Sequence, residues 1–156
     1  MTYERFEDLP VWKAAIDLAI KIYALTERTP FRRKYSLRDQ IERAALSISN
    51  NIAEGFERGT TQELLTFLYI SRGSAGEVRS MLCFTERLPV FKDFKSEISN
   101  LKLEAEGISR QLRAWADSLQ NSEIKGQRYL SEKERSSVKN KKEKAEFLNM
   151  LKSYKK

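Results

Sequence analysis

The segment from residue 36 to residue 58 has the clearest pattern of hydrophobic and polar positions in the chain. Its apolar residues recur three or four positions apart, which is the spacing of one buried helix face: Leu37, Ile41, Ala44, Ala45, Ile48, Ile52 and Phe56. A polar stripe runs along one flank of that face: Gln40, Arg43, Ser47, Asn51, Glu54 and Arg58. Such side chains beside a core either form a polar seam within one chain or hydrogen-bond another subunit or a ligand. Both interpretations stay open at this stage.

The same periodicity predicts three more helices, over residues 9–27, 61–88 and 92–119. We expect Asp8 to cap the first helix, Ser36 the second with Asp39 in its first turn, and Thr60 or Thr61 the third. The last helix keeps alternating spacings of four and three residues from Phe94 to Leu119, which is typical of left-handed bundle packing.

The third predicted helix contains an unusual run of small residues, Gly73, Ser74, Ala75 and Gly76. Each glycine inside an exposed helix costs about 1 kcal/mol relative to alanine. We therefore expect a partner helix or another subunit to approach closely over Gly73, Ser74 and Gly76. The alternative is a break in the helix at this point.

These elements predict an all-α protein with an up-and-down antiparallel four-helix bundle over residues 1–120 and a charged C-terminal extension over residues 121–156. The composition agrees, since 40% of residues are apolar, 33% are charged and only three are proline. The extension is expected to be disordered or a lone helix with a small apolar patch at Phe147, Leu148 and Leu151.

The composition also argues against most catalytic and metal-binding functions. The chain has no histidine, so the commonest general base and metal ligand is missing. Cys83 is the only cysteine, as in an ordinary cytoplasmic protein, and the start of the chain has no apolar secretion core. Glu54 and Glu77 could converge as a carboxylate pair, but such pairs in a bundle more often anchor arginines. We predict no enzyme activity, no catalytic residue, no metal, no cofactor and no membrane span.

The formal net charge of +7 is unevenly distributed. Residues 121–156 carry eleven Lys and Arg against five Glu, so the extension is +6 and residues 1–120 only +1. A second group of cations surrounds the loop between the first two helices. The candidate nucleic-acid-binding residues are therefore Arg28, Arg32, Arg33, Lys34, Arg38, Lys139, Lys141, Lys142 and Lys144. The alternative is a solvated loop and a solubilising tail.

Three stretches resemble a known family: FEDLPVWKAAIDLAIKIYALT, SLRDQIERAALSISNNIAEGFER and FLYISRGSAGEV. Together they are similar to the four-helix bundle or 23S ribosomal RNA intervening-sequence proteins, which include the accessory variability determinants of diversity-generating retroelements. The resemblance implies a homopentameric barrel, and in the retroelement members a barrel that binds nucleic acid and a reverse transcriptase. The positions that match the family pattern are Gln40, Arg43, Asn51, Glu54, Gly55, Arg58, Gly73, Ser74 and Glu77. We expect all of these except Gly55 to form an assembly and polar seam.

This chain departs from the family pattern in two ways. Glu42 and Ser49 stand where an arginine and a proline are usual, which predicts a straighter and less basic second helix. The loop before that helix is basic here, whereas acidic residues are common there in the family. The leading hypothesis is a non-enzymatic oligomeric scaffold that binds RNA, a reverse transcriptase or both. The alternative is a structural or protein-interaction oligomer with no nucleic-acid role.

Overall fold

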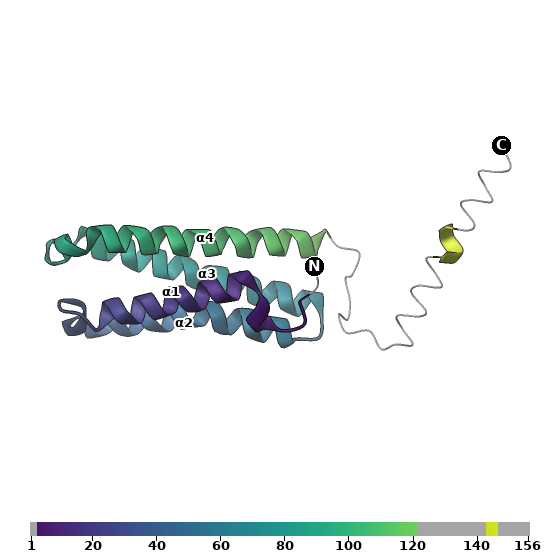
Figure 1. Cartoon of the computed structure of the whole chain (residues 1–156), viewed down its shortest axis with the longest axis horizontal. Helices are drawn as coiled ribbons and strands as arrows, with labels where there is room; N and C mark the ends of the chain where they lie inside the picture. Colours follow the sequence, from purple (N-terminus) through teal and green to yellow (C-terminus); the bar gives the residue numbers. More distant parts are fainter. Residues whose placement is uncertain (1–2, 122–142, 147–156) are drawn as a thin grey trace, which may run out of the picture.

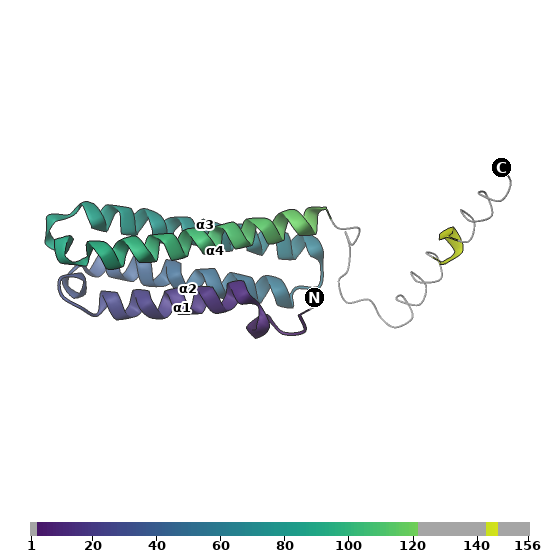
Figure 2. The same ribbon diagram turned by 45° about the horizontal axis from the view of Figure 1, so that its top comes forward.

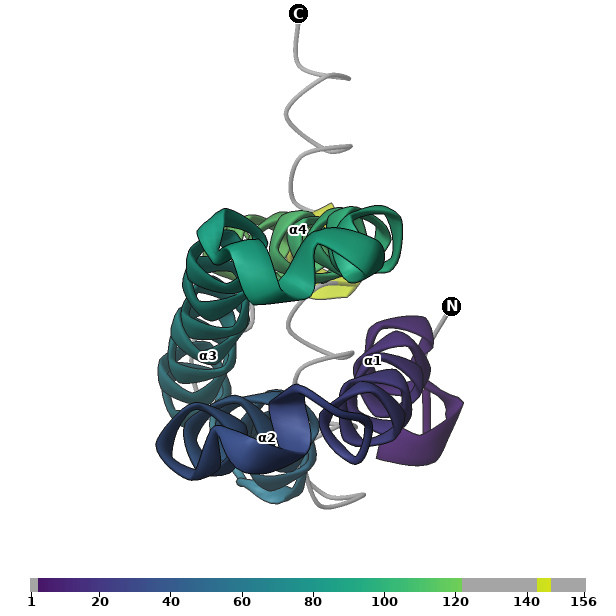
Figure 3. The ribbon, with the colours of Figure 1, turned by 90° about the vertical axis from the view of Figure 1, so that its left-hand side faces the viewer.

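The computed structural model describes residues 3–121 and 143–146 and confirms the all-α bundle (Figure 1). Its four long helices are α1 (Pro10–Thr26), α2 (Tyr35–Glu57), α3 (Thr61–Arg87) and α4 (Lys95–Gln120). Three short 3-10 helices accompany them: η1 (Phe6–Asp8), η2 (Phe31–Arg33) and η3 (Pro89–Phe94). Seen along the bundle, each helix lies beside its neighbour in sequence, and α1 also contacts α4 (Figure 3).

One apolar core runs through the bundle. On α2 the predicted apolar stripe is buried from Ile41 to Phe56, and Leu37 is half-buried against the core. On α3, buried residues recur at the spacing of one helix face: Leu64, Leu68, Ser71, Ala75, Val78, Leu82 and Thr85. The largest fully buried side chains come from all four helices and both η2 and η3: Phe31, Phe91, Leu18, Ile22, Leu25, Ile41, Ile48, Ile52, Leu64, Leu68, Leu82 and Ile98. The periodicity therefore identified the core correctly.

The first residues of α1 and α2 show that two of the predicted helix caps are wrong. Asp8 does not cap α1, because it belongs to η1 and the buried Leu9 takes the N-cap position without a side-chain hydrogen bond. Pro10 follows at a position whose missing amide hydrogen needs no partner. Ser36 does not cap α2 either, since η2 leads through Lys34 directly into a helix that begins at Tyr35. Thr60 does cap α3, accepting a hydrogen bond from the Glu63 amide at 3.2 Å.

The fourth helix begins at Lys95 rather than at residue 92, because η3 precedes it. The short helix buries Phe91, whose ring lies 4.5 Å from that of Phe31 in η2. This contact holds η2 and η3 together at one end of the bundle. The pattern of spacing could not show it, since the two phenylalanines are 60 positions apart and belong to different connections.

The two ends of the bundle differ in what they carry. The α1–α2 and α3–α4 connections lie at one end, which we call the η2 end, and the α2–α3 connection lies at the other (Figures 1 and 2). Asn121, where the C-terminal extension starts, is at the far end of the 26-residue α4. At about 1.5 Å per residue, that helix separates Asn121 from the η2 end by roughly 40 Å.

Most of the C-terminal extension lies outside the described residues, including the proposed apolar patch at Phe147, Leu148 and Leu151. Residues 143–146 are helical and exposed. Within the described ranges, no helix is both long enough and apolar enough to cross a bilayer.

Candidate functional site

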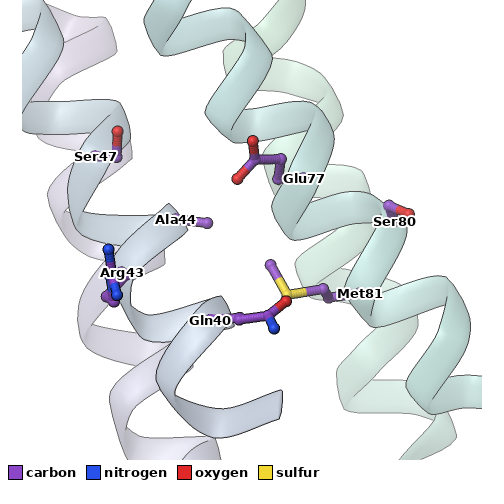
Figure 4. Close-up of a pocket in the computed structure, with 7 residues that line it drawn as sticks. All are labelled: Gln40, Arg43, Ala44, Ser47, Glu77, Ser80 and Met81. Atoms are coloured by element: carbon purple, nitrogen blue, oxygen red, sulfur yellow. The ribbon is translucent and has the colours of Figure 1, made fainter. Parts of the chain in front are cut away.

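A solvent-open groove lies between α2 and α3 and contains part of the predicted polar seam. Its volume is about 670 Å³, and we call it the α2–α3 groove. Four lining residues come from α2 and three from α3: Gln40, Arg43, Ala44, Ser47, Glu77, Ser80 and Met81 (Figure 4). Polar atoms dominate its surface, so it suits a polar partner better than an apolar one.

The polar side chains in the middle of the seam form hydrogen bonds within the chain. The hydroxyls of Ser47 and Ser74 are 2.9 Å apart, and the Asn51 amide donates to the Ser47 hydroxyl at 2.9 Å and to the Ser47 carbonyl at 2.7 Å. Beside them, the buried Ser71 donates across the interface to the Ile48 carbonyl at 2.8 Å. The Ser47–Ser74 and Ser71–Ile48 bonds join α2 to α3, so this part of the stripe is an intramolecular polar seam.

The groove end of the seam is different. The Arg43 guanidinium is exposed and pairs with Asp39 on its own helix at 3.7 Å. Glu77 extends into the groove towards α2 (Figure 4). Exposed pairs of this kind contribute little to stability, so no contact among the described residues explains why Arg43, Gln40 and Glu77 gather here. Their role in assembly stays a prediction.

The other end of the seam lies at the α2–α3 connection. Arg58 donates to Glu54 at 2.6 Å, lies 3.7 Å from Glu63, and its guanidinium sits 5.2 Å from the centre of the Phe67 ring. The hydrogen bond to Glu54 raises the pKa of Arg58 above its ordinary value. Glu54 therefore anchors an arginine, and it lines a different hollow from Glu77. The two carboxylates do not form a pair.

The glycines contradict the expectation of a close helix approach inside the subunit at Gly73 and Gly76. Both are exposed positions of a continuous helix, and a Cβ atom added to either would meet nothing within 4 Å. The close approach occurs instead at Gly55 on α2, where an added Cβ would lie 2.7 Å from the Cβ of Phe67. Contact of Gly73 with another subunit stays a prediction, whereas Ser74 is buried in the seam.

The five predicted cations of the loop do gather at the η2 end, but they divide into two groups. Arg28 donates to both Glu97 oxygens at 2.8 and 3.0 Å and lies 4.6 Å from the centre of the Phe94 ring. Arg38 approaches Glu42 on its own helix at 3.8 Å. Each of these two cations thus has a carboxylate partner, and Arg28 ties the α1–α2 connection to the start of α4.

Arg32, Arg33 and Lys34 form the second group, which we call the loop cations. All three side chains are exposed, and among the described residues none of them forms an ion pair. The buried Phe31 fixes the turn on which they lie. Three exposed positive charges that have no carboxylate partner among the described residues, held on an anchored turn, attract phosphate groups.

The sequence patterns did not indicate three further residues at this end: Lys92, Lys95 and Tyr35. Lys92 and Lys95 come from η3 and the start of α4, and they lie at the same end of the bundle as the loop cations because Phe91 packs on Phe31. The exposed Asp93 lies between them. Tyr35, the first residue of α2, is 73% exposed beside Lys34. Antiparallel topology predicts that residues after Pro89 meet the first loop, so the lysines could have been found from the sequence.

The tail cations are placed only in part. Lys144 is exposed on the helical residues 143–146, and Lys139, Lys141 and Lys142 lie outside the described residues. The extension begins after Asn121, at the end of the bundle opposite the η2 end (Figure 1). Their part in RNA binding stays a prediction.

The described residues contain no cluster of three or more side chains able to hold a metal ion. Comparison with curated proteins gives no match. Comparison with protein families gives one over residues 7–114, to the family described as 23S rRNA-intervening sequence protein. This match spans more than half of the chain and includes α1, α2, α3 and most of α4. The chain therefore belongs to the family of 23S rRNA-intervening sequence proteins.

Proposed function

We propose that the protein is a non-enzymatic, cytoplasmic, homo-oligomeric scaffold that binds RNA through the η2 end of each subunit. The observation that carries this proposal is the anchored turn with three exposed cations, Arg32, Arg33 and Lys34, that no carboxylate of the described residues neutralises. The family description, which refers to ribosomal RNA, supports RNA as the polyanion.

Electrostatic attraction explains both the affinity and its dependence on assembly. Each phosphate contacted by a cation releases counterions and contributes in a sequence-independent way. Three cations in one subunit give weak binding, but a ring of subunits repeats the same site along one RNA chain. Linked sites raise the overall affinity strongly without any new contact. A homopentamer, as the family resemblance implies, would present five such turns.

A reverse-transcriptase partner belongs to the proposal through the resemblance alone. The α2–α3 groove, with the exposed Arg43 and Glu77, is the surface we assign to protein contacts, either between subunits or with that partner.

A second candidate function is a structural or protein-interaction oligomer without RNA. The exposed apolar side chains on α2 and α3, Leu46, Ile70 and Phe84, favour it, since exposed apolar groups are common at protein interfaces. The near-neutral charge of residues 1–120 also fits this candidate.

Titration of mixed-sequence RNA by fluorescence anisotropy at several salt concentrations separates the two candidates. We expect the logarithm of affinity to fall linearly with the logarithm of salt concentration, with a slope of about 0.7 per phosphate neutralised on a single strand. Replacing Arg32, Arg33 and Lys34 with alanine should weaken binding and flatten this slope. Removing residues 121–156 tests the tail cations in the same way.

The matched control removes the same charge elsewhere. Arg79, Arg110 and Arg113 are exposed on α3 and α4, and Arg110 and Arg113 pair with Glu106 and Asp117 on their own helix. Their replacement by alanine should affect binding much less. Equal losses in both triple variants would show that only net charge matters and would contradict an η2 site. If the full-length protein fails to bind RNA at low salt, the second candidate replaces the first.

A further inference from the structure

Tyr35 differs from the other aromatic side chains of the bundle. It is 73% exposed, the highest fraction of any large apolar or aromatic side chain in the described part of the chain. The apolar stripe of α2 begins at Leu37 and turns away from Tyr35, so the ring projects outside the core. Within the described residues its hydroxyl forms no hydrogen bond. Neither burial nor a hydrogen bond within the described residues therefore explains the position of this ring.

The surroundings hold the ring in place without covering it. Tyr35 is the first residue of α2, and the Arg38 amide one turn later donates to the Lys34 carbonyl at 2.9 Å, which fixes the start of the helix. The Arg38 guanidinium lies 6.0 Å from the ring centre. A short turn anchored by the buried Phe31 precedes it. An aromatic face on such a rigid support is already arranged for contact.

The loop cations immediately precede this ring in the chain. Proteins that bind single-stranded nucleic acid combine cations that follow the phosphate backbone with exposed aromatic rings on which bases stack. A duplex conceals the faces of its bases, whereas unpaired segments expose them. We propose that Tyr35 stacks on an unpaired base of RNA whose phosphates contact Arg32, Arg33 and Lys34. This inference rests on the proposed function and adds that the RNA is single-stranded at the site.

The experiment separates stacking from charge. Anisotropy titrations compare oligoadenylate with an abasic ribose-phosphate strand of the same length, so the two ligands differ only in their bases. We expect the wild-type protein to bind oligoadenylate more tightly. Tyr35→Leu should remove most of that preference, about fivefold to 150-fold in affinity for one stacked base. The salt dependence should not change, because no cation is lost.

Two controls accompany this variant. Tyr35→Phe retains an aromatic face and should retain the preference for bases. Tyr69→Leu removes an exposed tyrosine near the other end of the bundle, where its hydroxyl accepts a hydrogen bond from Gln120 at 2.7 Å, and should leave the preference intact. Circular dichroism should show the same helicity in all three variants.

The outcomes are distinguishable. If Tyr35→Leu keeps the preference for oligoadenylate while the triple loop variant loses affinity for both strands, stacking is wrong and the proposed function stands. Stacking is also wrong if the wild-type protein binds the two strands equally. If the wild-type protein binds neither strand at low salt, RNA binding itself is wrong and the stacking site fails with it.

Discussion

Gly55 on α2 lies so close to Phe67 on α3 that a single added carbon would overlap it. The Cβ of an alanine at position 55 would be 2.7 Å from the Cβ of Phe67 and 3.2 Å from Cδ1 of Leu64. Cβ atoms at this distance must move apart, and the Cβ of Phe67 can move only with its backbone. Gly55 therefore sets the separation of α2 and α3 near their connection.

We expect Gly55→Ala to destabilise the protein. Overpacking costs roughly 1–3 kcal/mol, which outweighs or at least cancels the gain of about 1 kcal/mol in helix propensity. Gly107→Ala is the matched control, because an added Cβ there meets nothing within 4 Å and should raise stability. Denaturant unfolding followed by circular dichroism measures both free energies. Equal stabilisation by both substitutions would contradict the tight crossing.

Gly73→Leu tests assembly separately from folding. Because an added Cβ at Gly73 meets nothing in the same subunit, we expect the isolated fold to tolerate the larger side chain. If another subunit packs over this position, the oligomer should weaken and its mass should fall in light scattering on a sizing column. Gly73→Ala, a much smaller change, should keep the mass of the wild type. A wild-type mass for Gly73→Leu would place position 73 outside the subunit interface.

Replacing Arg28 should mainly lower stability, whereas replacing Arg32 should mainly weaken RNA binding. Arg28→Ala removes the paired contacts to Glu97 and the contact with the Phe94 ring, and should lower the unfolding free energy by about 1 kcal/mol. Arg32→Ala removes an exposed cation with no ion-pair partner in the described chain and should leave stability unchanged. In RNA titrations, Arg32→Ala should weaken binding more than Arg28→Ala. Identical effects of the two variants in both measurements would contradict this division of the loop cluster.

The contact between Glu86 on α3 and Lys102 on α4 should make stability depend on pH. The hydrogen bond from Lys102, 2.5 Å from Glu86, lowers the pKa of the Glu86 carboxyl from its ordinary value of 4.5. A group whose pKa is lower in the folded state stabilises the fold above its unfolded pKa, and that contribution disappears as pH falls through the folded value. Glu86→Gln should therefore be less stable than the wild type at neutral pH.

This difference should shrink as the pH falls below 4.5, because the wild-type carboxyl then also becomes neutral. Denaturant midpoints measured at neutral and acidic pH check it. Glu57→Gln, at an exposed position on α2, is the control and should show no comparable difference. A Glu86→Gln difference that is constant with pH would mean that packing rather than charge is responsible.

The sequence by itself determined the number of long helices, their order and their buried faces. Residues such as Ile48 and Leu82 recur at helical spacing, and burying one continuous stripe per helix leaves few arrangements other than an antiparallel bundle. It also brought together the loop cations, since they are neighbours in the chain. These are local properties, and local spacing is enough to fix them.

Only the tertiary structure decided which of those residues already have a contact partner on another helix. Arg28 and Arg32 read alike in sequence, but Glu97, 69 positions from Arg28, neutralises one of them. Gly55 and Gly73 also read alike, yet Phe67 approaches only Gly55. In each case the deciding partner belongs to another helix, and its distance depends on how the helices cross and on where each one begins. Helical periodicity defines the face of the helix on which a residue lies. The partner of that residue follows from the packing of the whole bundle.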